Sequence, residues 1–233
     1  MLASAIPRRL PSLADRSDPQ SVFVVGLGRF GSAVALELED LGHEVLAMDA
    51  SESLVQSFSS KVTHVVSGDA TDPEVLRSLG VGQFSHAVVA IGDNIEASIL
   101  CAAALVELGV GEIWAKAITQ AHARILTLVG ATKVVFPERD MGTRLAHQVT
   151  GQMIDYIEID EDFALVETGP PMDLVGKTLL EAQLRSQYGV TVVSVKPPGG
   201  SFTYATPETA LDAGAVLLVA GEKASVERFA RST

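Results

Sequence analysis

The chain has 233 residues, of which 47% are hydrophobic, and a formal net charge of −12. This length suits one large domain or two small ones with a sizeable core. The negative charge argues against sequence-independent binding of DNA or RNA, which requires a basic face, so we expect no nucleic-acid partner. A single cysteine, Cys101, excludes an intramolecular disulfide and a cysteine metal cluster. The longest apolar run, 99–106, is too short to span a membrane, and we expect a cytoplasmic protein.

The first half of the chain alternates short apolar strands with helical stretches. We expect a flexible tail at 1–20, which contains three prolines, and then a domain over 21–138. The alternation is typical of an α/β protein with a Rossmann-like, doubly wound parallel sheet. We expect its strands at 22–25, 44–48, 63–66, 87–91, 113–117 and 133–136. We expect its helices at 30–41, 53–58, 73–79, 94–108 and 121–129.

The second half differs in character. A helix is predicted over 139–153, and we interpret 139–155 as a linker; apolar residues recur every four positions along it, at Met141, Leu145, Val149 and Met153. From 156 to 233 the pattern predicts a small α+β lobe. We expect its strands at 156–159, 164–167, 190–196, 202–204 and 215–219, and its helices at 179–186 and 225–231. A lobe this small, beside an apolar helix face, predicts a dimer or a larger assembly.

The most informative motif follows the first expected strand. Gly26, Gly28 and Gly31 form a G-x-G-x-x-G pattern, which permits a sharp turn, close approach of a pyrophosphate and tight packing of the next helix. Asp49 stands at the end of the second expected strand, where such folds bind a ribose. Strand, loop, helix, strand and acid in this order predict a nucleotide site. Arg29, inside the loop, suits more phosphate charge than a dinucleotide carries.

Polar residues also follow the later strands, at the edge where open parallel sheets bind ligands. Asp69 and Asp93 follow the third and fourth strands, where helix N-capping alone would explain them. Lys116 ends the fifth strand, and a solvated strand end is its alternative explanation. Glu138 follows the sixth strand, and its alternative role is to cap the next helix.

No residue pattern points to a catalytic centre. None of the three tyrosines is followed four positions later by lysine, no Gly-x-Ser-x-Gly is present, and no two histidines stand at i, i+4. A nucleotide site without a reacting group indicates a sensor rather than an enzyme. Two alternatives stay open: an NAD-dependent oxidoreductase, supported by the glycine motif with Asp49, and a regulator gated by NAD(H).

Residues 21–231 resemble the RCK or KTN family, the cytosolic regulatory subunits of bacterial Ktr and Trk potassium-uptake systems, and are most similar to its KtrA and KtrC type. The resemblance is carried by seven motifs together. These are G-L-G-R-F-G at 26–31, M-D at 48–49, G-D-A-T at 68–71, A-I-G-D-N at 90–94, K-A at 116–117, P-E-R-D-M-G at 137–142 and L-R-S-Q-Y-G at 184–189.

The resemblance implies a regulator gated by ATP or ADP. It implies homodimers that assemble into an octameric ring on the inner face of the plasma membrane, docked on a separate potassium-translocating subunit. Asp49 would hold the ribose, Asp69 would lie near the nucleoside and Arg29 would reach the γ-phosphate. The implied nucleotide-site residues are Gly26, Gly28, Arg29, Phe30, Gly31, Asp49, Asp69, Ala70, Ile91, Gly92, Asn94 and Lys116.

Two further ligands follow from the same resemblance. Glu138 would contribute to a cation site, for Mg²⁺ or Ca²⁺, between paired nucleotides. Cyclic di-AMP would bind the second lobe at Leu184, Arg185, Val190, Thr191 and Val192. This chain departs from the family pattern there in two places, since Thr191 stands where relatives often carry asparagine and two prolines follow the strand at 197–198.

Overall fold

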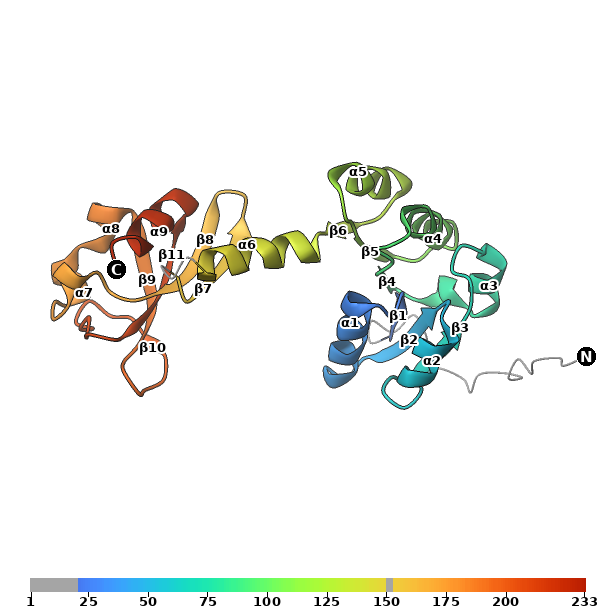
Figure 1. Cartoon of the computed structure of the whole chain (residues 1–233), viewed down its shortest axis with the longest axis horizontal. Helices are drawn as coiled ribbons and strands as arrows, with labels where there is room; N and C mark the ends of the chain where they lie inside the picture. Colours follow the sequence, from blue (N-terminus) through green and yellow to red (C-terminus); the bar gives the residue numbers. More distant parts are fainter. Residues whose placement is uncertain (1–20, 150–152) are drawn as a thin grey trace, which may run out of the picture. The chain divides into compact units, whose positions relative to one another are not determined.

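The structure, a computed structural model, describes residues 21–149 and 153–233. Contacts divide the chain after Pro137 into two compact units, and Figure 1 traces the elements of both. The tail expected at 1–20 lies outside the described residues.

The first unit is built on a six-stranded sheet in which every pair of neighbouring strands is parallel. The strand order is β3-β2-β1-β4-β5-β6, which confirms the predicted Rossmann-like, doubly wound sheet. The strands are β1 (Ser21–Val25), β2 (Glu44–Asp49), β3 (His64–Ser67), β4 (His86–Val89), β5 (Glu112–Lys116) and β6 (Lys133–Val135).

Helices cover both faces of this sheet. The central strand β1 is buried along its whole length and alternates between two cores: Val22 and Val24 face one, Phe23 and Val25 face the other. A strand buried on both faces needs a continuous apolar run, and this is what the sequence provides. The helical segments are α1 (Arg29–Asp40), α2 (Glu52–Phe58), α3 (Pro73–Ser78), the 3₁₀ turn η1 (Val81–Gln83), α4 (Ile95–Glu107) and α5 (Gln120–Val129).

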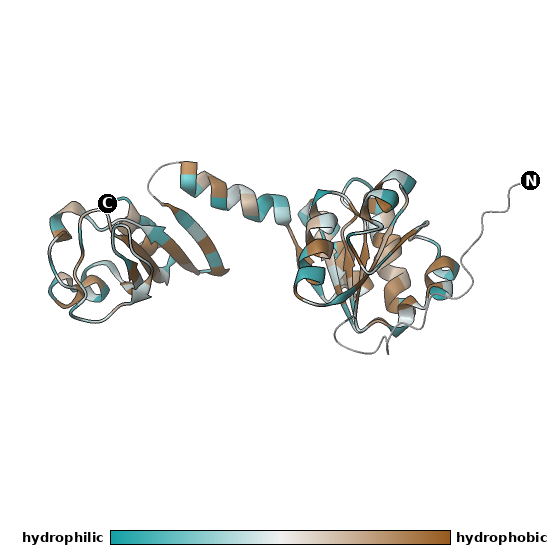
Figure 2. Ribbon diagram, turned by 90° about the horizontal axis from the view of Figure 1, so that it is seen from below, coloured by the Kyte–Doolittle hydropathy of each residue, from teal (hydrophilic) through white to brown (hydrophobic). Residues whose placement is uncertain are grey.

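The second unit contains helix α6 (Pro137–Val149) and a five-stranded antiparallel sheet in the order β10-β9-β11-β8-β7. Its apolar residues gather on the inner sides of the strands and helices (Figure 2). The strands are β7 (Asp155–Asp160), β8 (Phe163–Thr168), β9 (Val190–Lys196), β10 (Thr203–Tyr204) and β11 (Val216–Glu222). The helical segments are η2 (Met172–Leu174), α7 (Leu179–Ala182), α8 (Leu184–Tyr188) and α9 (Lys223–Ala230).

One helix expected in this unit, at 179–186, is in fact two. Gln183 has a φ of +46°, in the left-handed region, so α7 ends before it and α8 begins after it. A left-handed residue interrupts the helical hydrogen bonds. The break turns Leu184 into the core of the unit.

Helix α6 begins at Pro137, before the predicted start, and is described as far as Val149. Met153, the predicted last residue, lies outside any helix with 6% of its surface exposed, in the core of the second unit. The apolar character of Met153 therefore reflects burial under the sheet rather than a helix face. Met141, Leu145 and Val149 do share one face of α6, and all three are exposed in the single chain. In the described part of the chain, no helix combines the length and the apolar character needed to cross a bilayer.

His122, on α5, is a buried titratable group. Its side chain is 1% exposed, and neither ring nitrogen has a hydrogen-bond partner among the described residues. Burial lowers the pKa of its imidazole, because the charged form loses solvation. The folded protein therefore holds this ring neutral.

We expect His122 to make stability depend on pH. The unfolded chain binds a proton at this ring below about pH 6.5, whereas the folded state binds it only at lower pH. The contribution of the neutral His122 ring to the free energy of unfolding is therefore complete above about pH 6.5. It is lost as the pH falls through the lower pKa that this ring has in the folded state. Urea unfolding at several pH values from about 8 to about 5 should give a steeper loss of unfolding free energy for the wild type than for His122→Leu. Equal slopes would contradict this.

Candidate functional site

The glycine loop between β1 and α1 uses each of its glycines differently. Gly26 has a φ of +91°, which favours glycine, and its N–H donates to the carbonyl of Met48 at 2.8 Å. A Cβ at Gly31 would lie 1.8 Å from the carbonyl oxygen of Gly26, so α1 packs directly on the end of β1. A Cβ at Gly28 would meet nothing within 4 Å. Gly28 directly precedes α1, so the open space lies at a helix N-terminus, which attracts anions.

Asp49 connects this loop to the end of β2. Its Oδ2 accepts the N–H of Leu27 at 2.6 Å, and its Oδ1 accepts the N–H of Ser51 at 2.8 Å. A carboxylate has about four lone-pair positions, so two remain for hydroxyl donors. The carboxylate thus fixes the glycine loop and keeps capacity for a ribose.

Lys116, the last residue of β5, lies over the loop that follows β4. A Cβ at Gly92 would lie 2.8 Å from its Nζ and 3.0 Å from its Cε. Lys116 is half-buried at this strand end. The structure therefore brings an ammonium group to the same sheet edge as Asp49 and the glycine loop.

Asp69, in the loop after β3, is exposed and ionised. Its Oδ1 accepts the backbone N–H of Thr71 at 2.9 Å and the hydroxyl of Thr71 at 2.7 Å. These two bonds, the backbone one first, lower the pKa of the Asp69 carboxyl. The carboxylate shapes its own loop and presents its other oxygen at the sheet edge.

The capping explanation for Asp69 and Asp93 is wrong. Asp72 caps α3 by accepting the N–H of Glu74 at 2.9 Å, and Asn94 caps α4 by accepting the N–H of Ala97 at 3.0 Å. Asn94, predicted to bind the nucleotide, therefore already uses its side-chain oxygen in the helix cap.

The remaining residues predicted to bind the nucleotide differ in how far they are exposed to a ligand. Arg29 is exposed at the first position of α1, and Phe30 is half-buried beside it. Ala70 is buried in the first core, so it could reach a ligand only through its backbone, whereas Ile91 packs against that core and is partly exposed. Sequence reasoning missed Ser51, whose N–H binds Asp49 and whose Oγ caps α2; its position directly before a helix was the available signal.

Glu138 is exposed in the first turn of α6, within the second unit. The helix already begins at Pro137, one position before Glu138. Among the described residues, no three His, Cys, Asp or Glu side chains cluster closely enough to hold a metal ion.

The residues predicted to bind a second nucleotide lie on α8 and β9. Leu184 and Val190 are buried in the second core, and Val192 packs against it. Arg185 and Thr191 present the polar groups, and the Nε of Arg185 donates to the Oγ1 of Thr191 at 3.3 Å.

Residues 22–137 match the family model of the TrkA-N domain, and residues 164–233 match that of the TrkA-C domain. The chain is 40% identical over 207 residues to Ktr system potassium uptake protein C of Bacillus subtilis (strain 168), covering 88% of this chain and 94% of that protein.

Two solved structures share the fold. The GsuK RCK domain superposes with a TM-score of 0.66 at 19% identity, covering 99% of this chain and 50% of that one. The GsuK channel bound to NAD gives a TM-score of 0.64 at 21% identity, covering 95% and 40%. The likeness confirms the predicted RCK fold, although the chain spans about half or less of these proteins.

The glycine loop gives a matched pair of variants. In an ordinary helix, Gly→Ala stabilises by about 1 kcal/mol. Gly31→Ala should instead lower the free energy of unfolding by about 1–3 kcal/mol, because its methyl group collides with the Gly26 carbonyl. Gly28→Ala should change it by less than about 0.5 kcal/mol, because the space is open. Urea titrations measure both, and equal effects would refute the packing described for this loop.

Proposed function

We propose that this chain, which belongs to the TrkA-N/TrkA-C family of potassium uptake proteins, is a regulatory subunit that binds a nucleotide and controls potassium uptake by a separate membrane subunit. The observation that carries the proposal is the group of residues at one edge of the six-stranded sheet, where its parallel strands end. There the open Gly28 position, the partly available Asp49 carboxylate and the Lys116 ammonium lie at or directly after the carboxyl ends of β1, β2 and β5 in one TrkA-N domain.

ATP or ADP is the proposed nucleotide. Arg29 and Lys116 bring two positive charges to the edge. This suits the terminal phosphate of ATP or ADP better than the pyrophosphate of NAD(H), which is esterified at both ends and carries less negative charge. NAD(H) is the alternative, because a carboxylate at Asp49 also suits the ribose of that cofactor, and one GsuK channel is bound to NAD. Competition between ATP and NADH in calorimetry distinguishes the two.

The proposed assembly is a homodimer that builds an octameric ring on the cytoplasmic face of the membrane. Its support is the exposed apolar stripe of Met141, Leu145 and Val149 on α6, which a second copy would cover. Light scattering measures the mass, and a monomer at micromolar concentration with and without nucleotide refutes the proposal.

Regulation without catalysis is the proposed mode of action. The decisive experiment places the potassium-translocating subunit in vesicles and measures potassium uptake with and without this chain, in ATP and in ADP. Uptake that depends on the chain and on the nucleotide supports the proposal, and uptake indifferent to both overturns it. Steady oxidation of NADH with carbonyl compounds, followed at 340 nm, would instead support the oxidoreductase.

We propose cyclic di-AMP as a second ligand, held in the second unit by Arg185 and Thr191. The guanidinium of Arg185 suits a phosphate. Calorimetry of the wild type and of Arg185→Gln with cyclic di-AMP tests this, and affinity unchanged by the substitution excludes the role of Arg185.

Asp49→Asn should weaken ATP and ADP about equally, by tenfold or more, because each charge-assisted bond contributes roughly 1.5–3 kcal/mol. The ribose is common to both nucleotides, which is why the loss should be equal. Asp40→Asn, which removes the same charge from an exposed position at the end of α1, is the control and should leave both affinities unchanged. Calorimetry with wild-type affinity in Asp49→Asn would leave Asp49 a purely structural role.

Glu138→Gln tests the proposed cation. Beside a triphosphate, a carboxylate is repelled by roughly 4 kcal/mol per charge pair at about 4 Å, unless a divalent cation bridges them. Mg²⁺ or Ca²⁺ should therefore raise the melting temperature of the ATP-bound protein more than that of the ADP-bound protein. Glu138→Gln should remove most of this difference, whereas Asp140→Asn, on the same exposed helical turn, should retain it. An identical cation effect in Glu138→Gln excludes Glu138 as a ligand.

A further inference from the structure

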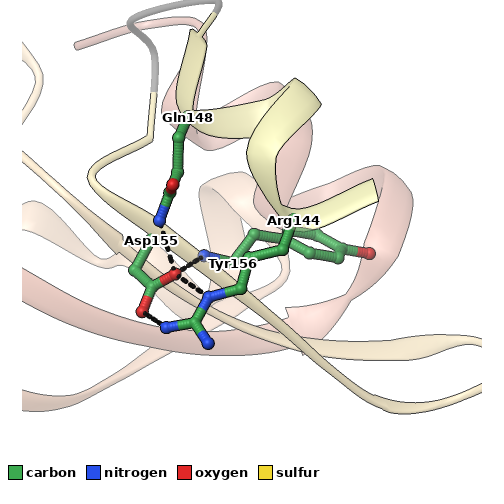
Figure 3. A network of polar contacts seen from close by, with 4 residues as sticks. All are labelled: Arg144, Gln148, Asp155 and Tyr156. Carbon is green, nitrogen blue, oxygen red and sulfur yellow. Dashed lines mark hydrogen bonds and ion pairs between the residues drawn. The ribbon is translucent and has the colours of Figure 1, made fainter. Parts of the chain in front are cut away.

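Carboxylates bridge helices to strands in both units. In the second unit, Asp155 on β7 accepts from the Nε of Arg144 at 2.6 Å and from Gln148 at 2.9 Å, both on α6, and from the N–H of Tyr156 at 2.8 Å (Figure 3). In the first unit, Glu39 on α1 has a similar arrangement. Asp155 lies apart from the candidate nucleotide site, whereas Glu39 belongs to the helix that begins at the glycine loop.

Glu39 lies in the last turn of α1, at the end of the helix farthest from the glycine loop. Its Oε1 accepts the backbone N–H of Val45 at 3.3 Å. The same oxygen accepts the backbone N–H of Thr63 and, at 2.7 Å, the hydroxyl of Thr63. Val45 is the second residue of β2, and Thr63 directly precedes β3. One carboxylate therefore joins the end of α1 to the starts of two neighbouring strands.

Strand β2 is bonded to the α1 segment at both of its ends. At the start of the strand, the N–H of Val45 donates to Glu39. At its end, Asp49 accepts the N–H of Leu27, in the loop directly before α1, at 2.6 Å. The first carboxylate extends from the helix to the strand, and the second extends from the strand to the loop. Together the two bonds fix both the position and the direction of α1 relative to β2.

Apolar packing does little to fix the direction of α1. Of the 12 residues of this helix, Gly31 and Ala35 are buried, and Leu38 is a partly buried hydrophobic residue packed against the core beneath it. Glycine and alanine have no long side chain that interlocks with a sheet. Hydrogen bonds to a charged acceptor are directional and stronger than those between neutral groups. Glu39 therefore supplies an orientation that the small side chains of α1 do not.

We propose that Glu39 is a positioning residue for the nucleotide site. It sets the direction of α1, and thereby the separation between the phosphate-binding start of this helix and the ribose-binding Asp49. Glu39 lies about 16 Å from Gly28 along the helix axis, so it acts without touching the ligand. A site whose groups are loosely held binds more weakly, because the ligand must then order them. The effect on nucleotide affinity rests on the proposed function, whereas the effect of Glu39 on the glycine loop does not.

Hydrogen exchange in the full chain without nucleotide tests this positioning directly. The amides of Gly26 and Leu27 are bonded to the end of β2, so their exchange rates report how firmly the glycine loop is held. Glu39→Ala should raise these rates by about fivefold or more, although the substitution lies at the opposite end of the helix. Glu37→Ala, which removes the same charge from an exposed position on α1, is the control and should leave both rates unchanged.

Calorimetry with three ligands provides the second readout. Glu39→Ala should weaken ATP and ADP by about threefold to tenfold, and adenosine, which has the ribose and no phosphate, by less than about twofold. A substitution that only destabilised the fold would weaken all three ligands by the same factor. Glu39→Gln keeps an acceptor oxygen without the charge, and Thr63→Val removes one of the three bonds. Each should weaken ATP by about twofold and leave adenosine unchanged.

Wild-type exchange at Gly26 and Leu27 in Glu39→Ala overturns the positioning role, and so does an equal loss of affinity for adenosine and ATP. If Glu39→Ala does not fold, Glu39→Gln and Thr63→Val take its place in both measurements, and wild-type values in both variants overturn the role. Calorimetry of the wild type tests the proposed function separately. If the wild type binds no nucleotide, the proposed function fails, while hydrogen exchange still decides whether Glu39 holds the glycine loop.

Discussion

The close approach of α1 to the end of β1 is the constraint on which the candidate site depends. No side chain fits at Gly31, because the carbonyl of Gly26 occupies that space. This contact fixes where the helix begins, and so places the open Gly28 position directly ahead of its first amides. Asp49 then binds the N–H of Leu27 and fixes the loop from the other side. A loop held by its own chain in this way is organised before a ligand arrives, which lowers the entropic cost of binding.

Charge explains how a strongly acidic chain could bind an anionic ligand. A net charge of −12 repels a nucleotide from most of the surface. At the sheet edge, the exposed Arg29 and the half-buried Lys116 provide positive charge at positions set by the backbone, one in the glycine loop and one above Gly92. Asp49 is occupied with backbone amides and faces the neutral ribose rather than the phosphates in the proposed arrangement. The positive charges proposed for the phosphates thus come from α1 and β5, and the carboxylate proposed for the ribose comes from β2.

Local sequence patterns predicted the first sheet. The features that these patterns missed depend on tertiary contacts. The strands and the glycine loop were readable because burial and turn geometry leave local signatures. The break at Gln183 was not, because a left-handed glutamine follows no sequence rule. Met153 continued the four-residue spacing of α6 and yet belongs to a different core. The pairing of Arg144 with Asp155, eleven residues apart between a helix and a strand, exists only once both elements are folded.

Helix α6 shows how one element can serve two partners. The residues bound by Asp155, Arg144 and Gln148, each precede by one position an exposed apolar residue, Leu145 and Val149. Successive residues are rotated by about 100° around a helix, so the polar row and the apolar row lie on different faces. One face is used within the chain, and the other stays available to a second copy. Helix α6 is thus bound to its own lobe on one side, and the proposed dimer would use the other.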